Sequence, residues 1–192
     1  MRRIVFLVLP LVFVLSACRT VPRVTDNAAG FRAALAGVAD RPNVAAGSDA
    51  ERTGIEGVKG LLGKIDAANV RASTSKVYAP DCYLNDTLKT LHGSAAIEAY
   101  FLATAETAES VAATFDDVTR SGDGLYYFRW VMETRLKKVA KGETIRTIGI
   151  SVVRFDAEGR VLVHQDYWDS ATGLFDHVPV VGWGTRAIKA RL

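Results

Sequence analysis

The sequence contains little cysteine and little histidine. Its 192 residues include two cysteines, Cys18 and Cys82, and three histidines, which lie far apart at positions 92, 164 and 177. A zinc site needs Cys and His ligands at characteristic short spacings, and no such spacing is present. We therefore expect neither a metal ion nor another cofactor.

A strong charge of either sign is also absent. The chain has 24 Lys and Arg against 21 Asp and Glu, for a formal net charge of +3. Two of the arginines and none of the acids fall in residues 1–17, so the remainder is nearly neutral. A nucleic-acid-binding domain shows a clustered basic excess, and we therefore expect no nucleic-acid partner.

The N-terminal apolar run is shorter than a typical transmembrane helix, which needs about 20 apolar residues. It follows Arg2 and Arg3, extends over residues 4–15 without a charge, and ends in Leu-Ser-Ala-Cys at positions 15–18. A positive start, an apolar centre and small residues before a cleavage point are the parts of a secretory signal. The ending resembles the lipobox of bacterial lipoproteins, which implies a signal peptide at residues 1–17 and a lipid-modified Cys18. An ordinary signal peptide or an N-terminal anchor helix is the alternative.

The resemblance to lipoproteins implies that the protein is located in the bacterial cell envelope. A lipid on Cys18 would anchor the protein to a membrane and leave it facing the periplasm. Arg19 favours the outer membrane, since in Gram-negative lipoproteins Asp at this place favours the inner one. Cys82 would then be the remaining thiol, and its neighbours Tyr83 and Leu84 favour a buried strand over a catalytic role.

The chain after Cys18 divides into a tether, a domain and a tail. Residues 18–48 are rich in small and polar residues and predict a flexible tether, with a weak helix through 31–35. Helical spacing from Ile55 to Ile65 predicts a first helix. A second helix is expected at 66–76, a short strand at 82–86, and a third helix at 95–106 capped by Ser94. Residues 172–192 predict a short amphipathic helix.

Four strands are predicted in the second half of the domain, at 111–119, 125–139, 144–155 and 161–169. Gly-containing turns separate them. The two middle strands are long, and such strands must bend to bury one face on helices. The fold class predicted for residues 49–171 is therefore α+β, with a curved antiparallel sheet packed on three N-terminal helices.

This order of elements resembles the nuclear transport factor 2-like (SnoaL-like) superfamily of α+β cone folds. Three segments carry the likeness: YAPDCYLND at 78–86, HGSAAI at 92–97, and VRFD with GRV between 153 and 161. The resemblance covers about residues 50–170 and implies a cone-shaped pocket. It does not imply one activity, because the fold hosts isomerases, dehydratases, cyclases and binding modules.

The resemblance also implies candidate catalytic residues. Asp86 matches the catalytic base of ketosteroid isomerases, and His164, Asp166 and Trp168 match pocket-facing positions on the last strand. Strand alternation independently places these last three on one face. Asp86 is either a base or a carboxylate that caps the loop to Thr90. His164 and Asp166 form either an acid–base pair or a satisfied polar network.

The departures from the isomerase pattern matter equally. The first helix has no Tyr, and Ser151 stands where the second oxyanion-hole donor, an Asp, is expected. Without these donors there is little to stabilise a dienolate, so steroid isomerisation is not expected. The residues expected to contact a ligand are Tyr78, Tyr83, Trp130, Ser151 and Trp168.

Two functions therefore remain open. The favoured one is a lipid-anchored module whose pocket binds a small apolar ligand or a partner without catalysis. The alternative is an isomerase, dehydratase or cyclase using Asp86 with His164 and Asp166. The aromatic strand at 126–130 suggests a homodimer surface on the sheet. The basic tail predicts either a contact with an anionic membrane or a lid over the pocket.

Replacing the proposed lipid acceptor, Cys18, tests the predicted lipid modification. The variant Cys18→Ser has no thiol to acylate at this position, so metabolic labelling with a radioactive fatty acid should be lost from the protein. Cys82→Ser is the matched control and should label like the wild type. Equal labelling of Cys18→Ser and the wild type would contradict the lipoprotein assignment.

Overall fold

The computed structural model describes residues 26–192, and the expected signal peptide and Cys18 lie outside the described residues. Residues 31–192 form one compact unit. The α-helices are α2 (Ala29–Gly37), α3 (Asp49–Leu62), α4 (Ala67–Val77), α5 (Ser94–Thr107), α6 (Ser170–Gly173) and α7 (Val181–Lys189). The strands are β1 (Tyr78–Asn85), β2 (Thr90–His92), β3 (Ala108–Arg120), β4 (Tyr126–Leu136), β5 (Thr144–Phe155) and β6 (Val161–Trp168). None of the described helices is long and apolar enough to cross a bilayer.

The six strands form a single sheet in the order β2-β1-β6-β5-β4-β3. The expected meander from β3 to β6 is antiparallel throughout. The predicted antiparallel arrangement holds for these four strands, but the sheet as a whole is mixed, because β1 pairs with β6 in parallel. The chain reaches β6 from β1 only after α5 and the whole meander, and this long connection permits a parallel pair.

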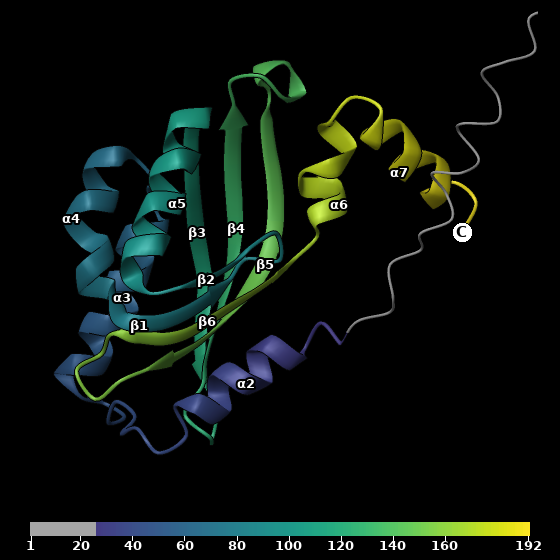
Figure 1. Cartoon of the computed structure of the whole chain (residues 1–192). Helices are drawn as coiled ribbons and strands as arrows, with labels where there is room; N and C mark the ends of the chain where they lie inside the picture. The colour runs from purple at the N-terminus through teal and green to yellow at the C-terminus, as the bar shows by residue number, and fades with distance from the viewer. Residues whose placement is uncertain (1–25) are drawn as a thin grey trace, which may run out of the picture. The chain divides into compact units, whose positions relative to one another are not determined.

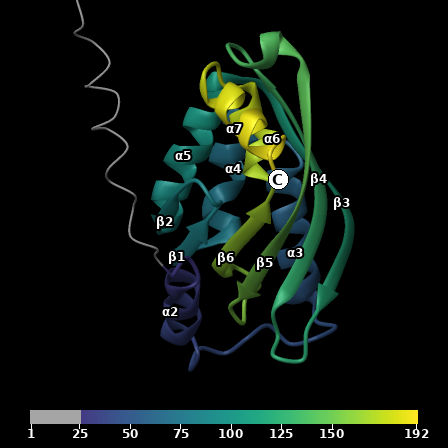
Figure 2. The same ribbon diagram turned by 90° about the vertical axis from the view of Figure 1, so that its right-hand side faces the viewer.

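Helices α3, α4 and α5 cover one face of the sheet (Figures 1 and 2). The sheet bends around them, and β3 changes register between Phe115 and Asp117, where a bulge favours local curvature. The buried core lies between the helices and the sheet, with Val58 and Leu61 from α3 and Ile97 from α5 fully buried. The α+β cone fold expected from the sequence is therefore confirmed.

Two local expectations differ from the structure. Ser94 does not cap α5; the cap position is Gly93, whose φ of 84° lies in the left-handed region that favours glycine. Residues 31–48, expected to be a flexible tether, make specific contacts with the domain. Val44 is buried, and the Arg154 guanidinium donates to the carbonyl oxygens of Val38 and Arg41 at 3.2 and 2.9 Å.

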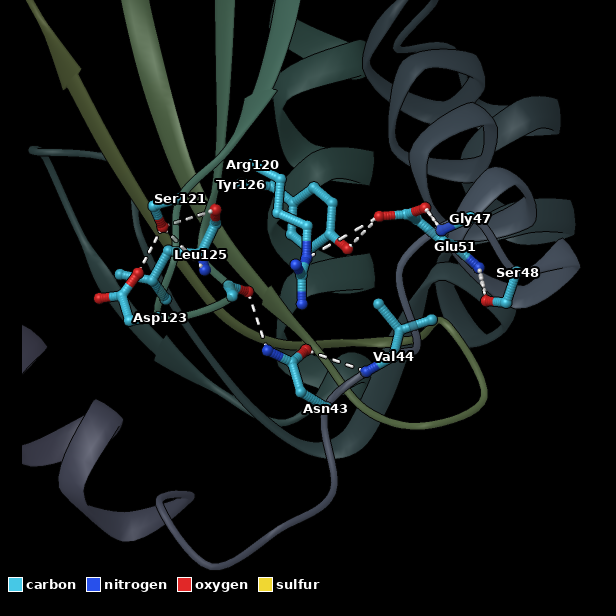
Figure 3. A network of polar contacts seen from close by, with 11 residues as sticks. Asn43, Val44, Gly47, Ser48, Glu51, Arg120, Ser121, Asp123, Leu125 and Tyr126 are labelled. Atoms are coloured by element: carbon cyan, nitrogen blue, oxygen red, sulfur yellow. Dashed lines mark hydrogen bonds and ion pairs between the residues drawn. The ribbon is translucent and has the colours of Figure 1, made fainter.

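Glu51 connects the start of α3 to the β3–β4 hairpin (Figure 3). Its carboxylate accepts hydrogen bonds from the Tyr126 hydroxyl and from the backbone N–H of Gly47. These bonds, led by that from Tyr126, lower the pKa of Glu51. On the same side, Asn43 Nδ2 donates to the Gly124 carbonyl at 2.9 Å. Half-buried hydrogen bonds thus join the start of α3 and the segment before it to the sheet.

Gly54 brings α3 against the β5–β6 turn. A Cβ at this position would lie 2.5 Å from the backbone oxygen of Gly159, whereas a Cβ at Gly60 on the same helix meets nothing within 4 Å. Gly54→Ala should therefore lower the free energy of unfolding by about 1–3 kcal/mol through overpacking. Gly60→Ala should raise it by about 0.5–1 kcal/mol. Urea denaturation measures both, and equal effects of the two variants would contradict the close packing.

Candidate functional site

A cavity of about 180 Å³ lies between the helices and the inner face of the sheet. Its wall is formed by helices α3, α5 and α6, by every strand except β2, and by adjoining loop residues. The wall is mostly apolar and aromatic, and its members of this kind are Leu62, Ile65, Leu84, Leu88, Tyr100, Phe101, Val111, Ala113, Trp130, Met132, Leu136, Ile145, Trp168 and Leu174. Its polar side chains are Asp86, Thr104, Thr134, Thr147, Ser151, His164 and Asp166.

His164, Asp166 and Trp168 of β6 all line this cavity, as strand alternation predicts. Directly across the sheet, Asp166 pairs with Ser151 of β5. The fold therefore brings the polar candidates of two strands to one patch of an otherwise apolar wall.

The imidazole of His164 lies between two polar partners. Its Nδ1 is 2.7 Å from the Tyr78 hydroxyl, and its Nε2 is 2.8 Å from Asp166 Oδ1. Both His164 and Tyr78 are fully buried. The two rings are also stacked, with centroids 6.0 Å apart.

These contacts determine one tautomer of His164. The buried Tyr78 hydroxyl has His164 Nδ1 as its one hydrogen-bond partner in the described residues, so the hydroxyl proton must point to that nitrogen. Nδ1 then accepts, and Nε2–H donates to Asp166. Burial and the nearby Asp166 charge raise the pKa of Tyr78 well above its usual value, which keeps the hydroxyl proton in place for this role.

Ser151 and Trp130 extend the chain of hydrogen bonds to β4. Trp130 Nε1 donates to Ser151 Oγ at 2.9 Å, and Ser151 in turn donates to Asp166 Oδ1. Gly149 permits this arrangement, since a Cβ there would lie 2.3 Å from the indole ring of Trp130. Four strands thus contribute to one polar chain that ends on a single carboxylate oxygen.

The second oxygen of Asp166 remains available to the cavity. Oδ1 accepts from both His164 and Ser151, while Oδ2 accepts no hydrogen bond from the described residues. The side chain of Asp166 is 17% exposed, against 1% for His164. Asp166 Oδ2 is therefore a pre-oriented acceptor at the edge of an apolar space.

Asp86 is placed differently. It lines the cavity, but Oδ1 accepts from the backbone N–H groups of Leu88 and Lys89 at 3.0 and 2.7 Å. Oδ2 accepts from the Tyr100 hydroxyl, and Trp168 Nε1 donates to the Asp86 carbonyl at 2.7 Å. Both carboxylate oxygens are thus used in ordering the loop after β1, which makes Asp86 a poorer candidate for a base than Asp166.

Two of the residues expected to contact a ligand do not line the cavity. Tyr78 lies behind His164, and the hydroxyl of Tyr83 donates to Gln165 at 3.4 Å. Trp130, Ser151 and Trp168 do line it.

Sequence reasoning missed three parts of the cavity. Tyr100 of α5 contacts Asp86 from the helix layer, Met132 of β4 lies in the sheet wall, and Leu174 follows α6. The position of Tyr100 beside the apolar stripe of α5 was the one available signal.

Among residues 26–192, no group of three or more His, Cys, Asp or Glu side chains could hold a metal ion. Cys82 is buried, and burial raises the pKa of its thiol to about 12. Such a thiol is almost entirely protonated near neutral pH and is a weak nucleophile.

Comparison with known proteins agrees with this architecture. The model of the SnoaL-like domain family matches residues 58–164, and the chain belongs to this family. No curated protein matches the sequence.

Several solved structures share the fold. A Catenulispora acidiphila protein with a ketosteroid isomerase-like fold, in complex with trimethylamine, is 21% identical, with a TM-score of 0.54 over 62% of this chain and 89% of its own. An epoxide hydrolase of M. tuberculosis is 10% identical, with a TM-score of 0.54 over 74% and 98%. A putative SnoaL-like polyketide cyclase of Shewanella denitrificans is 18% identical, with a TM-score of 0.54 over 65% and 94%. At these identities the likeness shows the fold alone.

Removing the Tyr78 hydroxyl tests the polar chain. Tyr78→Phe leaves the buried Nδ1 of His164 without a donor, which should lower the free energy of unfolding by about 1–3 kcal/mol. Imidazole nitrogen NMR should show the Nε2–H tautomer of His164 in the wild type and a mixture in the variant. Tyr83→Phe removes a longer hydrogen bond and should leave the His164 signals unchanged. A wild-type Nδ1–H tautomer would contradict the assignment.

Proposed function

We propose that this domain binds a small, largely apolar molecule in its cavity and holds one polar group of that molecule with Asp166 Oδ2. One observation carries the proposal: a mostly apolar cavity is lined by Asp166, one of whose carboxylate oxygens is oriented but accepts no hydrogen bond from the described residues. Small-molecule sites combine mostly apolar walls with a few placed polar groups in this way.

The cavity limits the size and chemistry of the occupant. A cavity of about 150 Å³ holds a molecule the size of benzene, so a volume of about 180 Å³ suits a single small ring or a short branched chain. The free oxygen is an acceptor, and it favours a hydroxyl or a protonated amine over a carbonyl. Trp130 and Trp168 provide flat apolar surfaces that also suit an alkylammonium group.

Acid–base catalysis by Asp166 is the second candidate. His164 donates to one oxygen of Asp166 and is itself held by Tyr78, which fixes the direction of the other oxygen. A carboxylate in this setting could take a proton from a carbon of the bound substrate. It could return the proton to another carbon, as in an isomerase, or to a hydroxyl that leaves as water, as in a dehydratase. Solved structures of this fold include an epoxide hydrolase and a putative polyketide cyclase. In such a mechanism Asp86 would order the cavity wall without taking a proton.

The binding site would work at a membrane surface. The lipobox-like ending at Cys18 and the preceding apolar run support export to the periplasmic face of a bacterial envelope membrane, with Arg19 favouring the outer one. Among the residues that the structure describes, the cavity lining begins at Leu62. A lipid on Cys18 would hold this domain at the membrane surface.

One probe separates the two candidates. 2-Hydroxycyclohexanone carries a hydroxyl donor and an acidic C–H beside a ketone, and its single ring suits the cavity. Calorimetry should detect binding to the wild type, and Asp166→Asn should weaken it about tenfold or more through loss of a charge-assisted hydrogen bond. Asp81→Asn, at an exposed carboxylate on β1, is the matched control and should bind like the wild type.

The same probe reports catalysis. In deuterium oxide, proton NMR measures loss of the C–H signal beside the ketone. Binding without protein-dependent exchange supports the binding module, whereas exchange that Asp166→Asn abolishes supports acid–base chemistry. If the probe binds wild type and Asp166→Asn equally, or binds neither, Asp166 is not the anchoring group.

A further inference from the structure

Helix α7 is amphipathic, and its apolar side is turned outward. Val180, the cap residue just before α7, is 83% exposed, and Trp183 and Ile188 within the helix are 72% and 63% exposed. Trp183, Gly184, Ala187 and Ile188 lie on one side of the helix by their spacing. An ordinary surface helix buries such a stripe against its own domain.

The opposite side of α7 is polar and faces the domain. Asp176, in the turn η3 (Phe175–His177), receives bonds from this side: the Thr185 hydroxyl and Lys189 Nζ donate to its carboxylate. Arg186 donates to its backbone oxygen at 2.6 Å. The main neighbour of α7 is η3 rather than the sheet. These bonds fix the rotation of the helix, so the apolar stripe stays outward.

The charged residues of this C-terminal segment are of one sign, although Arg186 and Lys189 lie on the side that is bonded to Asp176. Residues 177–192 contain Arg186, Lys189 and Arg191 and no Asp or Glu. Arg191 continues the exposed stripe one turn beyond Ile188. An outward apolar stripe that contains Trp and is followed by Arg191, in a segment without acidic residues, matches helices that lie in the interface of an anionic bilayer.

We propose that α7 docks on the surface of an anionic lipid bilayer, with Val180, Trp183 and Ile188 in the acyl-headgroup boundary and Arg191 at the lipid phosphates. The docking is separate from any lipid on Cys18 and from the molecule held in the cavity. Figure 1 shows α7 following α6 at the end of β6, and α6 and Leu174 form part of the cavity wall. The docked helix would therefore hold that part of the wall close to the bilayer.

The depth of Trp183 tests the proposal. The full chain is reconstituted into vesicles of phosphatidylethanolamine and phosphatidylglycerol (roughly 3:1, an anionic surface), with or without brominated acyl chains. The Trp183 emission is the difference between the wild type and Trp183→Phe, which removes the contribution of the other two Trp residues, Trp130 and Trp168. Brominated chains should quench this emission roughly twofold or more, because the indole lies within the boundary.

Two substitutions at exposed isoleucines make the test specific. Ile188→Ser should reduce the quenching, whereas Ile148→Ser, at a residue 70% exposed on β5, should not. Replacing phosphatidylglycerol with phosphatidylcholine, or Arg191 with Ala, should also reduce it. The proposal is overturned if Trp183 is quenched by aqueous acrylamide but not by brominated lipid, or if both isoleucine variants behave alike. A protein partner would then be the occupant of this face.

Discussion

A neutral imidazole buried in an apolar core needs one hydrogen-bond donor and one acceptor, and an unpaired nitrogen there costs about 1–3 kcal/mol. His164 meets this requirement with Tyr78 from β1 and Asp166 from its own strand. Ser151 of β5 then donates to Asp166 Oδ1, and Trp130 of β4 donates to Ser151 Oγ. The same bonds that stabilise the core leave Asp166 Oδ2 facing the cavity, so the stability of this wall and the chemistry of the site depend on one set of contacts.

Much of the fold follows from local sequence pattern. The strand predicted at 144–155 has those bounds in the structure, because β-branched residues lie between clear turn signals. The inward direction of His164, Asp166 and Trp168 follows from the two-residue period of a strand. The parallel pairing of β1 with β6 does not follow, because residues distant in sequence meet only through the packing of intervening elements. Local sequence pattern therefore predicts neither the register nor the direction of this strand pair.

The errors at the site have the same origin. Tyr78 and Tyr83 were both expected at the ligand, but β1 changes its register against β6 between them, so simple alternation does not assign their sides. Tyr100 was missed because helical spacing places it next to Phe101 without showing which one reaches the loop after β1. For α7, spacing predicts an amphipathic helix, whereas its rotation depends on Asp176, which belongs to a separate turn.

The parallel pairing of β1 with β6 also bears on the order in which the molecule folds. Tyr78 and His164 are 86 residues apart in sequence, and closing a loop of this length costs chain entropy before any contact compensates for it. The helices and the β3–β4–β5 meander contain more local contacts and need not wait for this closure. The Asp166 carboxylate is then positioned only when the last strand docks, so a chain with β6 detached lacks this part of the cavity wall. The binding proposed for the cavity would therefore appear late in folding and would be lost early when β6 detaches.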